Sequence, residues 1–270
     1  MSAPGRKTLY TGRSKAMARC LSDPVKIAQD HFLLTLNAPE MKNSSPGQFV
    51  NIRVSGCSDP LVRRPFSIFF HENHRVEIIV KTVGRGTRAI TGFRAGDSID
   101  MLGPLGRGFT PITRGRALLA GGGVGNAPLY YLSRRLTEAG IPCTYLYCCR
   151  SSAHLYLREN FEAAADSFIV ATDDGSCGER GRAPEIAERL LKGDRFDIVY
   201  TCGPTPMMEG VARAATGAGV PVEVSLENYF GCGIGLCSGC TVETEKGNKR
   251  ACVDGPVMDG SIINWHSFTA

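Results

Sequence analysis

Residues 15–112 alternate apolar and polar side chains with a period of two, and turn-forming stretches interrupt the alternation. The alternation is clearest in three runs, at 49–54, 76–81 and 97–102. A period of two over short runs is typical of strands that bury one face. We therefore predict an antiparallel barrel or sandwich for this region, interrupted by one helix at about 87–93.

Residues 115–221 follow a different pattern, in which short apolar runs are followed by segments with helical spacing. The expected strands are 117–120, 144–149, 168–171 and 197–201, and the expected helices are 129–139, 184–191 and 206–216. Strands that alternate with helices form parallel sheets, because the crossover between two parallel strands needs a dozen or more residues. We predict a doubly wound parallel sheet here.

Residues 222–270 are rich in loops, and they hold four of the 11 cysteines. A chain of 270 residues is long enough for two or three small domains with buried cores. The sequence thus predicts a β-barrel plus α/β fold class in three domains, namely a barrel at 15–112, an α/β domain at 113–221 and a small domain at 222–270. Residues 1–14 are interpreted as an extension without an assigned function.

Composition and charge exclude several classes of protein. Hydrophobic residues make up 43% and charged residues 21% of the chain, which excludes general disorder. The net charge of +5 does not argue for nucleic acid or an anionic membrane as a partner. No apolar run approaches the roughly 20 residues that span a bilayer, and the N-terminus lacks the apolar core of a secretory signal. The odd number of cysteines, most of them scattered, favours the reducing cytoplasm.

The cysteine cluster is the most specific signal, with the spacing Cys232-x4-Cys237-x2-Cys240-x11-Cys252. A plant-type 2Fe–2S ferredoxin loop has the pattern C-x4-C-x2-C followed by a distant fourth cysteine. The backbone of such a loop must approach the sulfurs closely, and the loop at 231–240 is correspondingly rich in glycine. A structural zinc site, which favours two paired knuckles, and four unrelated buried cysteines are the alternatives.

Two segments of the first region could contact a flavin nucleotide. Arg63 and Arg64 offer positive charge to a pyrophosphate, while Phe66 offers a stacking face. Ser67 could form a hydrogen bond with the edge of the flavin ring. The glycine turn at 84–87 precedes the predicted helix, whose N-terminus would present free N–H groups to phosphate. Each segment has a simpler explanation, because Arg-Pro turns are common and a threonine at 87 could only cap the helix.

The α/β region contains three segments that could bind a dinucleotide. The glycine turn at 121–125 joins a strand to a helix as in a Rossmann fingerprint, although Asn126 stands where the third glycine would be expected. Asp173 and Asp174 could meet ribose hydroxyls or form Asx turns. The Cys-Gly-Pro segment at 202–204 follows the last strand. Ligands bind at the carboxyl ends of parallel strands, and all three segments lie there.

The order of these features resembles that of the ferredoxin–NADP reductase superfamily. The matching elements are R-P-F-S at 64–67, G-x-G-T at 84–87, G-G-G-x-G-x-A-P at 121–128, C-G-P at 202–204 and the C-x4-C-x2-C…C tail. The tail resembles more specifically that of the electron-transfer subunits of dihydroorotate dehydrogenase B, through the stretches 225–235 and 250–257. The resemblance covers about residues 15–265.

The resemblance implies a role for each matching residue. It implies that FAD is bound by Arg64, Pro65, Phe66, Ser67, Ile79, Val80, Lys81, Gly86 and Thr87. It implies that NAD is received by Gly121, Gly122, Gly123, Gly125, Cys202, Gly203 and Pro204, with Cys202 near the nicotinamide ring. It implies that Cys232, Cys237, Cys240 and Cys252 ligate a 2Fe–2S cluster. The three domains would accordingly bind FAD, NAD and the cluster.

The resemblance also implies a partner and a reaction. The family's partner is a catalytic subunit that carries FMN and oxidises dihydroorotate in pyrimidine (UMP) biosynthesis, within a heterotetramer of two copies of each subunit. This chain would pass the electrons through the cluster and FAD to NAD+. A flavin is required between them, because a cluster carries single electrons whereas nicotinamide accepts a hydride. No catalytic constellation is needed, and the five histidines are interpreted as surface or satisfied residues.

Other functions stay open at this point. A related subunit that reduces ferredoxin with NADPH, or one of sulfide dehydrogenase type, would share these motifs. A flavin and iron–sulfur redox sensor without turnover belongs to a different class, although the intact dinucleotide turn argues against it. A zinc-stapled interaction protein belongs to a third. The choice of NAD over NADP depends on the resemblance, since Arg150 and Arg158 could meet a 2′-phosphate.

Overall fold

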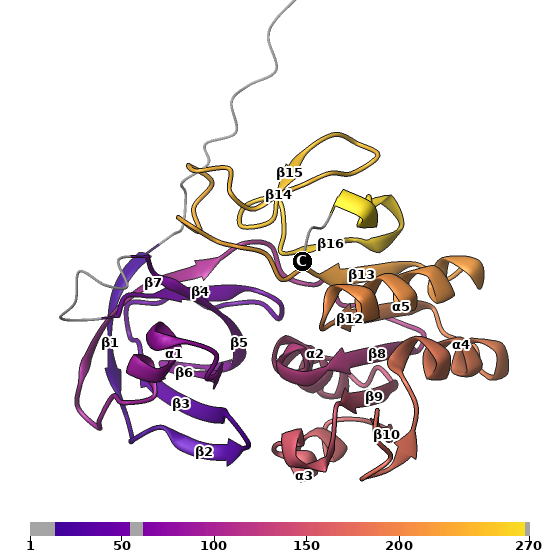
Figure 1. Cartoon of the computed structure of the whole chain (residues 1–270), viewed down its shortest axis with the longest axis horizontal. Coiled ribbons are helices and arrows are strands. Elements are labelled where there is room, and N and C mark those ends of the chain that lie inside the picture. Colours follow the sequence, from indigo (N-terminus) through magenta and orange to yellow (C-terminus); the bar gives the residue numbers. More distant parts are fainter. Residues whose placement is uncertain (1–13, 55–61, 268–270) are drawn as a thin grey trace, which may run out of the picture.

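The computed structural model describes residues 14–54 and 62–267, which form the three parts seen in Figure 1. Cys57 and residues 1–13 of the predicted extension lie outside the described residues. The barrel lies beside the α/β domain, and the C-terminal part rests across the top of both. The fold class predicted from the sequence is confirmed. No helix in the described ranges is long and apolar enough to cross a membrane.

The first part is a closed antiparallel barrel. Its strands are β1 (Ser14–Cys20), β2 (Val25–Ala28), β3 (His31–Asn37), β4 (Phe49–Ile52), β5 (Arg64–Glu72), β6 (Arg75–Lys81) and β7 (Ser98–Leu105). The order β1-β7-β4-β5-β6-β3 is closed by pairing of β1 with β3, and β2 pairs with β3. Burial alternates strictly along β7, so the period-two pattern does mark the inward face. Helix α1 (Arg85–Ile90) follows β6.

The second part is a parallel sheet with helices on both faces. Its elements are β8 (Ala117–Gly122), η1 (Gly123–Gly125), α2 (Asn126–Glu138), β9 (Cys143–Cys149), η2 (Ser152–His154), α3 (Arg158–Glu162), β10 (Ser167–Thr172), β11 (Glu179–Arg180), α4 (Ala183–Gly193), β12 (Ile198–Cys202), α5 (Thr205–Gly217) and β13 (Val222–Ser225). Helices α2 and α3 share a core with one face, and α4 and α5 with the other. The sheet order is β11-β10-β9-β8-β12-β13-β16. After β8, the strands β9 and β10 are added on one side of it, whereas β12 and β13 are added on the other side. Doubly wound folds bind ligands at the point where this order reverses, which here lies between β8 and β12.

The C-terminal part is small and is built on the edge of that sheet. It contains β14 (Thr241–Val242), β15 (Lys249–Arg250), β16 (Val257–Asp259), η3 (Gly260–Ile262) and η4 (Trp265–Ser267). Strand β16 runs antiparallel to β13 and so joins the sheet of the α/β domain. Met258 of β16 belongs to the same buried cluster as the apolar residues of α4 and α5, whereas Val257 belongs to the cluster on the opposite face of the sheet. The cysteine loop therefore has a rigid base.

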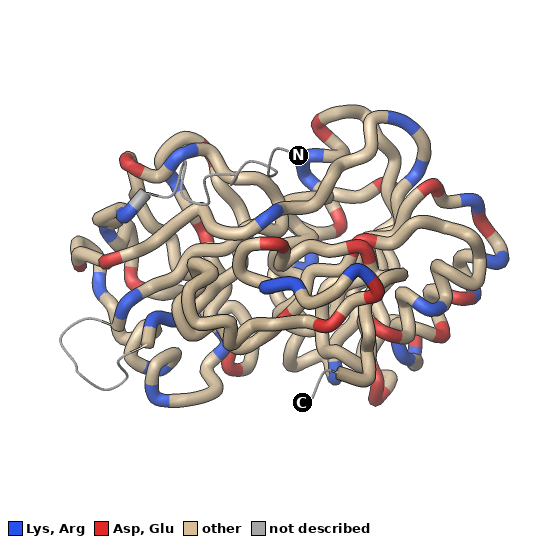
Figure 2. The backbone as a smooth tube through the Cα atoms, turned by 90° about the horizontal axis from the view of Figure 1, so that it is seen from above, with Lys and Arg blue, Asp and Glu red and all other residues tan. Residues whose placement is uncertain are grey.

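The structure differs from the sequence prediction in a few local places. The R-P-F-S segment forms the first residues of β5, and Pro65 lies opposite Asn51 of β4. Helix α3 was not expected, because its five residues are too few for a periodic pattern. Strand β13 falls within the third predicted region but pairs with β12. Charged residues of both signs are interspersed along the chain in Figure 2, as the small net charge predicts.

Candidate functional site

The cysteine loop folds around its own sulfur atoms. The Sγ atom of Cys232 accepts hydrogen bonds from the N–H groups of Ile234 at 3.5 Å, Leu236 at 3.2 Å and Cys237 at 3.4 Å. Burial alone would raise the pKa of the Cys232 thiol, but these N–H groups lower it to about 7. The loop thus stabilises a thiolate, which is the form that ligates a metal. Gly233, with φ of 70°, allows the chain to turn this tightly.

The four thiols form two pairs. Cys232 contacts Cys237, and Cys240 contacts Cys252, whose N–H group also donates to Cys240 Sγ at 3.4 Å. Contact with Cys252 lowers the pKa of Cys240 to about 6. None of the four forms a disulfide, and within the described ranges no three potential ligands gather as around a single metal ion. Two pairs of cysteine side chains fit a two-iron cluster better than a lone zinc ion, which needs four ligands around one point.

The loop is fastened to the barrel by a buried amide. Asn51 of β4 is fully buried, and its Nδ2 donates to the carbonyl oxygen of Cys232 at 3.3 Å. A Cβ atom on Gly233 would lie only 2.5 Å from Asn51 Nδ2, so this approach requires glycine. On the other side, the Arg250 guanidinium donates to the carbonyl of Gly235 at 2.6 Å. Sequence reasoning missed Asn51, although an amide within a buried strand run was a usable signal.

A cavity of about 390 Å³, here called the central cavity, lies where the three parts meet. The predicted FAD residues that line it are Pro65, Phe66, Ser67, Ile79, Lys81 and Thr87. The α/β domain contributes Gly125 and Cys202, and the C-terminal part contributes Glu227 and Phe230 among others. The volume is typical of small-molecule sites, and the wall combines aromatic rings with a few polar groups. These residues fit the ring of a flavin.

The other three predicted FAD residues, Arg64, Val80 and Gly86, lie outside this wall. The side chain of Val80 is fully buried in the barrel interior, because alternate residues of β6 face opposite sides. Arg64 lies against Gly86, where a Cβ atom would come within 2.7 Å of the Arg64 Nε atom. Within the wall, Thr87 accepts hydrogen bonds from the N–H groups of Val83 and Gly84, so its hydroxyl organises the turn before α1. These contacts agree with the interpretation that Thr87 caps the helix.

Two groups whose pKa is raised by burial line the central cavity. Burial raises the pKa of the Glu227 carboxyl above its ordinary value, although the Lys81 ammonium acts in the opposite direction. Burial, reinforced by Glu227, also raises the pKa of the Cys202 thiol, which is therefore neutral. Glu227 is a further candidate that was not assigned a role from its residue type. The signal was a carboxylate placed two residues before Tyr229, at the start of the cluster loop.

A second cavity of about 440 Å³, here called the sheet-edge cavity, opens at the carboxyl ends of β8, β9, β10 and β12. Gly122, Gly123 and Pro204 of the predicted NAD residues line it. Lys81 lines both cavities and so lies at their junction. The location of the sheet-edge cavity at the reversal between β8 and β12 is that of the dinucleotide site in doubly wound sheets.

The remaining predicted NAD residues form the glycine turn at 121–125 or pack against it. A Cβ atom on Gly125 would lie 2.5 Å from the carbonyl oxygen of Cys202, and one on Gly121 would clash with Asn126 Oδ1. Asn126, at the place of the third glycine, donates from Nδ2 to the carbonyl oxygens of Gly123 at 2.9 Å and Cys148 at 3.3 Å. The unusual asparagine thus fastens the turn to β9. Gly203 packs against Met207.

One expectation about a side chain near this cavity is wrong. His31 is not a surface or satisfied residue, because it is 1% exposed and its Nε2 has no partner among the described residues. It lines the sheet-edge cavity, as His154 does. Arg158 is not in the wall but lies 4.0 Å from Glu162 within α3, whereas Arg150 does line the cavity.

Comparison with known families covers most of the chain. Residues 19–109 match the oxidoreductase FAD-binding domain, residues 119–213 match the oxidoreductase NAD-binding domain, and residues 227–264 match the iron-sulfur cluster binding domain of dihydroorotate dehydrogenase B. The FAD, NAD and iron–sulfur binding predicted from the sequence is thereby confirmed.

Comparison with individual proteins gives the same family. The chain is 35% identical over 247 residues, or 88% of its length and 94% of the relative's, to the electron transfer subunit of dihydroorotate dehydrogenase B (NAD(+)) from Desulforamulus reducens. It is 39% identical to that of Geobacillus thermodenitrificans, with 86% of this chain and 92% of the relative covered.

A solved structure is similar over the whole fold. It belongs to a study of flavin-based electron bifurcation by the NADH-dependent reduced ferredoxin-NADP oxidoreductase. The TM-score is 0.84 at 34% identity, with 92% of this chain and 90% of that chain covered. Together, the shared order of three domains and the extent of these matches show that the chain belongs to the family of electron-transfer subunits of NAD+-dependent dihydroorotate dehydrogenase B.

Proposed function

We propose that this chain carries electrons from a catalytic partner subunit, which holds FMN and oxidises dihydroorotate, to NAD+ in pyrimidine biosynthesis. We further propose a heterotetramer with two copies of each subunit. The residues assigned above to FAD, NAD and the 2Fe–2S cluster are part of this proposal. When bound, FAD supplies the exchange between one-electron and two-electron carriers.

The observation that carries the proposal is that the three sites are continuous. Asn51 of β4 holds the cluster loop through its hydrogen bond to the Cys232 carbonyl. Strand β4 in turn pairs with the R-P-F-S segment of β5, with Asn51 opposite Pro65. Phe230, two residues before the first cluster cysteine, lines the central cavity and packs on Phe49 with ring centroids 4.8 Å apart. Lys81 then joins the central cavity to the sheet-edge cavity. A relay needs this contiguity, whereas three independent binding modules do not.

The chain's own residues prepare the central cavity for hydride chemistry. The buried Glu227 carboxyl holds a proton there at pH values where an exposed glutamate is ionised, because burial disfavours the charged form. The neutral Cys202 thiol adds no charge beside a hydride path. The apolar rings of Phe66 and Phe230 exclude water from the same space.

The exposed side of the cluster loop is the proposed docking surface for the catalytic subunit. Cys237 is exposed, and its neighbour Leu236 is 70% exposed. Tyr229, which precedes the first cluster cysteine by three residues, is 82% exposed. Large apolar and aromatic side chains gathered on a surface loop are typical of interfaces. Docking here would bring the partner directly onto the thiol ligands.

The test is reconstitution with the catalytic subunit encoded in the same genome. The complex should reduce NAD+ when supplied with dihydroorotate. The variant Cys237→Ser should retain FAD and NADH-dependent dye reduction but lose at least roughly 90% of the dihydroorotate-dependent rate, because it removes one cluster ligand. Cys177→Ser, which changes a half-buried cysteine outside both cavities, is the matched control and should keep the rate. Full coupled activity in the Cys237 variant would contradict the relay.

A second candidate function is exchange of electrons with ferredoxin in place of a dihydroorotate-oxidising subunit. It is favoured by the 34% identity and TM-score of 0.84 to the chain from the ferredoxin-NADP oxidoreductase study. The two candidates separate in one assay. If the chain couples NADH to ferredoxin and fails to couple to any dihydroorotate-oxidising subunit, the second function replaces the first.

A further inference from the structure

The wall of the sheet-edge cavity carries a net positive charge. Lys81, Arg150 and Arg182 line it, and Asp173 is the one carboxylate that its described wall includes. Neither Arg150 nor Arg182 forms an ion pair or side-chain hydrogen bond with any described residue. The inference drawn from this charge rests on the proposed function in one respect, because it takes the sheet-edge cavity as the dinucleotide site.

An unpartnered imidazole nitrogen indicates that this cavity is built for a ligand. His31 Nδ1 lies 2.5 Å from the carbonyl oxygen of Gln29, which can only accept, so Nδ1 carries the proton. The Nε2 atom is then left as an acceptor with no partner in the part of the chain that is described. A buried polar atom without a partner is destabilising, and a ligand hydroxyl or amine could donate a hydrogen bond to it. Stacking on Tyr156 at 5.4 Å holds the ring in this position.

Arg150 occupies the position that separates NAD from NADP in doubly wound folds. It directly follows Cys149, the last residue of β9, which is the second strand of the parallel sheet. At the corresponding place NAD-binding folds have an acidic residue for the ribose 2′-hydroxyl, whereas an arginine there accommodates a 2′-phosphate. An acidic residue does occur in the wall, but Asp173 follows β10, the next strand.

Arg182 adds a second guanidinium to the wall of the same cavity. It is the N-cap residue of α4, and the first helical residues Ala183 and Pro184 also line the cavity. The helix therefore presents its positive end to the space that Arg150 and Arg182 share. Two guanidiniums are the groups that bind a phosphate with two parallel hydrogen bonds each.

The cations divide into two sets that match two anionic groups. Lys81 lies at the junction of the two cavities, whereas Arg150 and Arg182 line the sheet-edge cavity alone. NAD carries one anionic group, its pyrophosphate, and NADP carries a second on the adenosine ribose. We propose that this chain takes NADP(H) as well as NAD(H), with the 2′-phosphate held between Arg150 and Arg182.

Binding of nucleotide fragments to the full chain, loaded with FAD and cluster, tests this directly. Adenosine 2′,5′-bisphosphate should bind at least about tenfold more tightly than 5′-AMP, since each charged hydrogen bond adds affinity. Adenosine 3′,5′-bisphosphate has the same charge with the phosphate on the neighbouring oxygen, and it should bind less tightly than the 2′,5′ isomer. Equal affinity of 5′-AMP and the 2′,5′ isomer would overturn the proposal, as would equal affinity of the two bisphosphates.

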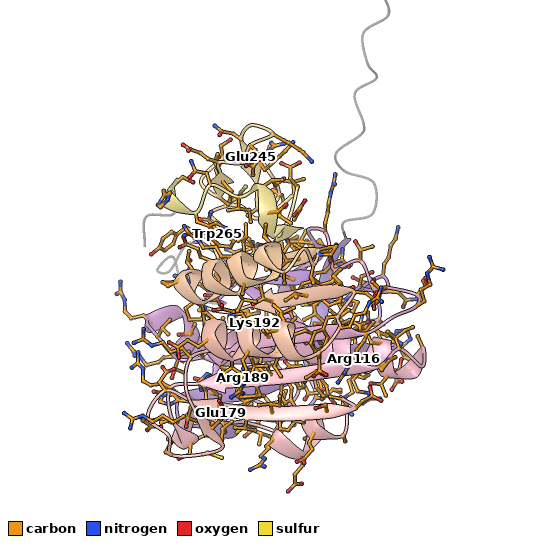
Figure 3. All side chains as sticks on the ribbon, turned by 90° about the vertical axis from the view of Figure 1, so that its right-hand side faces the viewer. Arg116, Glu179, Arg189, Lys192, Glu245 and Trp265 are labelled. Atoms are coloured by element: carbon orange, nitrogen blue, oxygen red, sulfur yellow. The ribbon has the colours of Figure 1, made fainter. Side chains whose placement is uncertain are left out.

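Two variants locate the effect. Arg150→Gln and Arg182→Gln should each lower the affinity ratio of the 2′,5′-bisphosphate to 5′-AMP about tenfold and lower the ratio of NADPH to NADH kcat/KM in dye reduction. Arg189→Gln is the control, because Arg189 pairs with Glu179 at 2.7 Å on the outer face of the domain, where Figure 3 shows the two side by side. An unchanged ratio in both cavity variants would overturn the assignment of these residues.

The outcomes separate this inference from the proposed function. A chain that couples to the dihydroorotate-oxidising subunit but shows no preference for the 2′-phosphate leaves the relay in place and refutes the inference. A chain that prefers the 2′,5′-bisphosphate but fails to couple refutes the relay and supports the inference.

Discussion

The cluster loop and the sheet-edge cavity differ in how far along the chain their residues come from. The four cluster cysteines lie within 232–252, and three of the bonds to Cys232 Sγ come from residues no more than five positions away. The wall of the sheet-edge cavity extends from His31 to Met207 and combines the barrel with the ends of four sheet strands. A site made by one loop can be recognised from spacing, whereas a site made by packing appears only in the folded chain.

The strongest test of this comparison is to disturb the close contact between the glycine turn and β12. Gly125→Ala would place a Cβ atom 2.5 Å from the carbonyl oxygen of Cys202. We expect the free energy of unfolding to fall by about 1–3 kcal/mol through overpacking and NADH-dependent dye reduction to fall more than about tenfold. The measurements are urea unfolding and the dye assay.

The control for this change is a glycine without a close neighbour. Gly217, at the end of α5, has no heavy atom within 4 Å of the position that an added Cβ atom would take. Gly217→Ala should therefore leave activity intact and stability equal or slightly higher. If Gly125→Ala behaves like this control, the close contact between the turn and β12 is not needed for the site.

A smaller effect is expected where the cluster loop depends on a distant residue. Asn51→Leu removes the hydrogen bond to the Cys232 carbonyl while keeping the side chain's size. We expect a loss of about 1 kcal/mol in stability and a several-fold faster release of iron to a chelator, with FAD content unchanged. Asn160→Leu, on exposed α3, is the control. Unchanged iron release in Asn51→Leu would show that the loop holds its shape alone.

The smallest effect concerns the contact between barrel and α/β domain, where His71 is held neutral. Its Nδ1 accepts the Ser44 N–H at 3.2 Å, its Nε2 lies 2.9 Å from the Asn73 carbonyl, and burial lowers its pKa. The unfolded chain therefore binds the proton more readily, so stability is complete above about pH 6.5 and declines as the pH falls below it. Tyr131 of α2 also donates to the His71 carbonyl at 3.3 Å, which ties this effect to the contact between the domains.

The measurement is the urea midpoint between about pH 8 and pH 5.5. His71→Asn should reduce the decline at low pH, while His74→Asn, which changes an exposed neighbour with only a small effect on the His71 pKa, should alter it much less. Part of the decline should persist in His71→Asn, because burial lowers the pKa of His31 as well. An identical pH profile in the wild type and His71→Asn would contradict the role assigned to His71.

The elements of the α/β domain could be predicted closely because their patterns are long and regular. The helix expected at 206–216 is α5 (Thr205–Gly217), and the strand expected at 144–149 is β9 (Cys143–Cys149). The five-residue α3 was missed because it completes little more than one helical turn. The assigned domain boundaries and the individual FAD, NAD and cluster residues stay predictions.

The candidate site was predictable where the spacing of residues along the chain indicates the chemistry, and less predictable where a role depends on burial. The cysteine spacing and the glycine turn could be identified from residue order alone. Asn51, Glu227 and His31 were missed, because the role of an asparagine, a glutamate or a histidine depends mainly on what surrounds it. Arg158 and Arg182 were indistinguishable as arginines in the sequence, and only the cavity separates them.

Residue order alone was sufficient for the fold class, the cysteine spacing and the family, because these depend on short-range patterns that any fold of the chain must keep. The side chains that meet at the two cavities could be identified only once the chain was folded. Burial and contact depend on how β3, β6 and β12 are brought together, and residues far apart in the chain can share a wall only after the strands have packed.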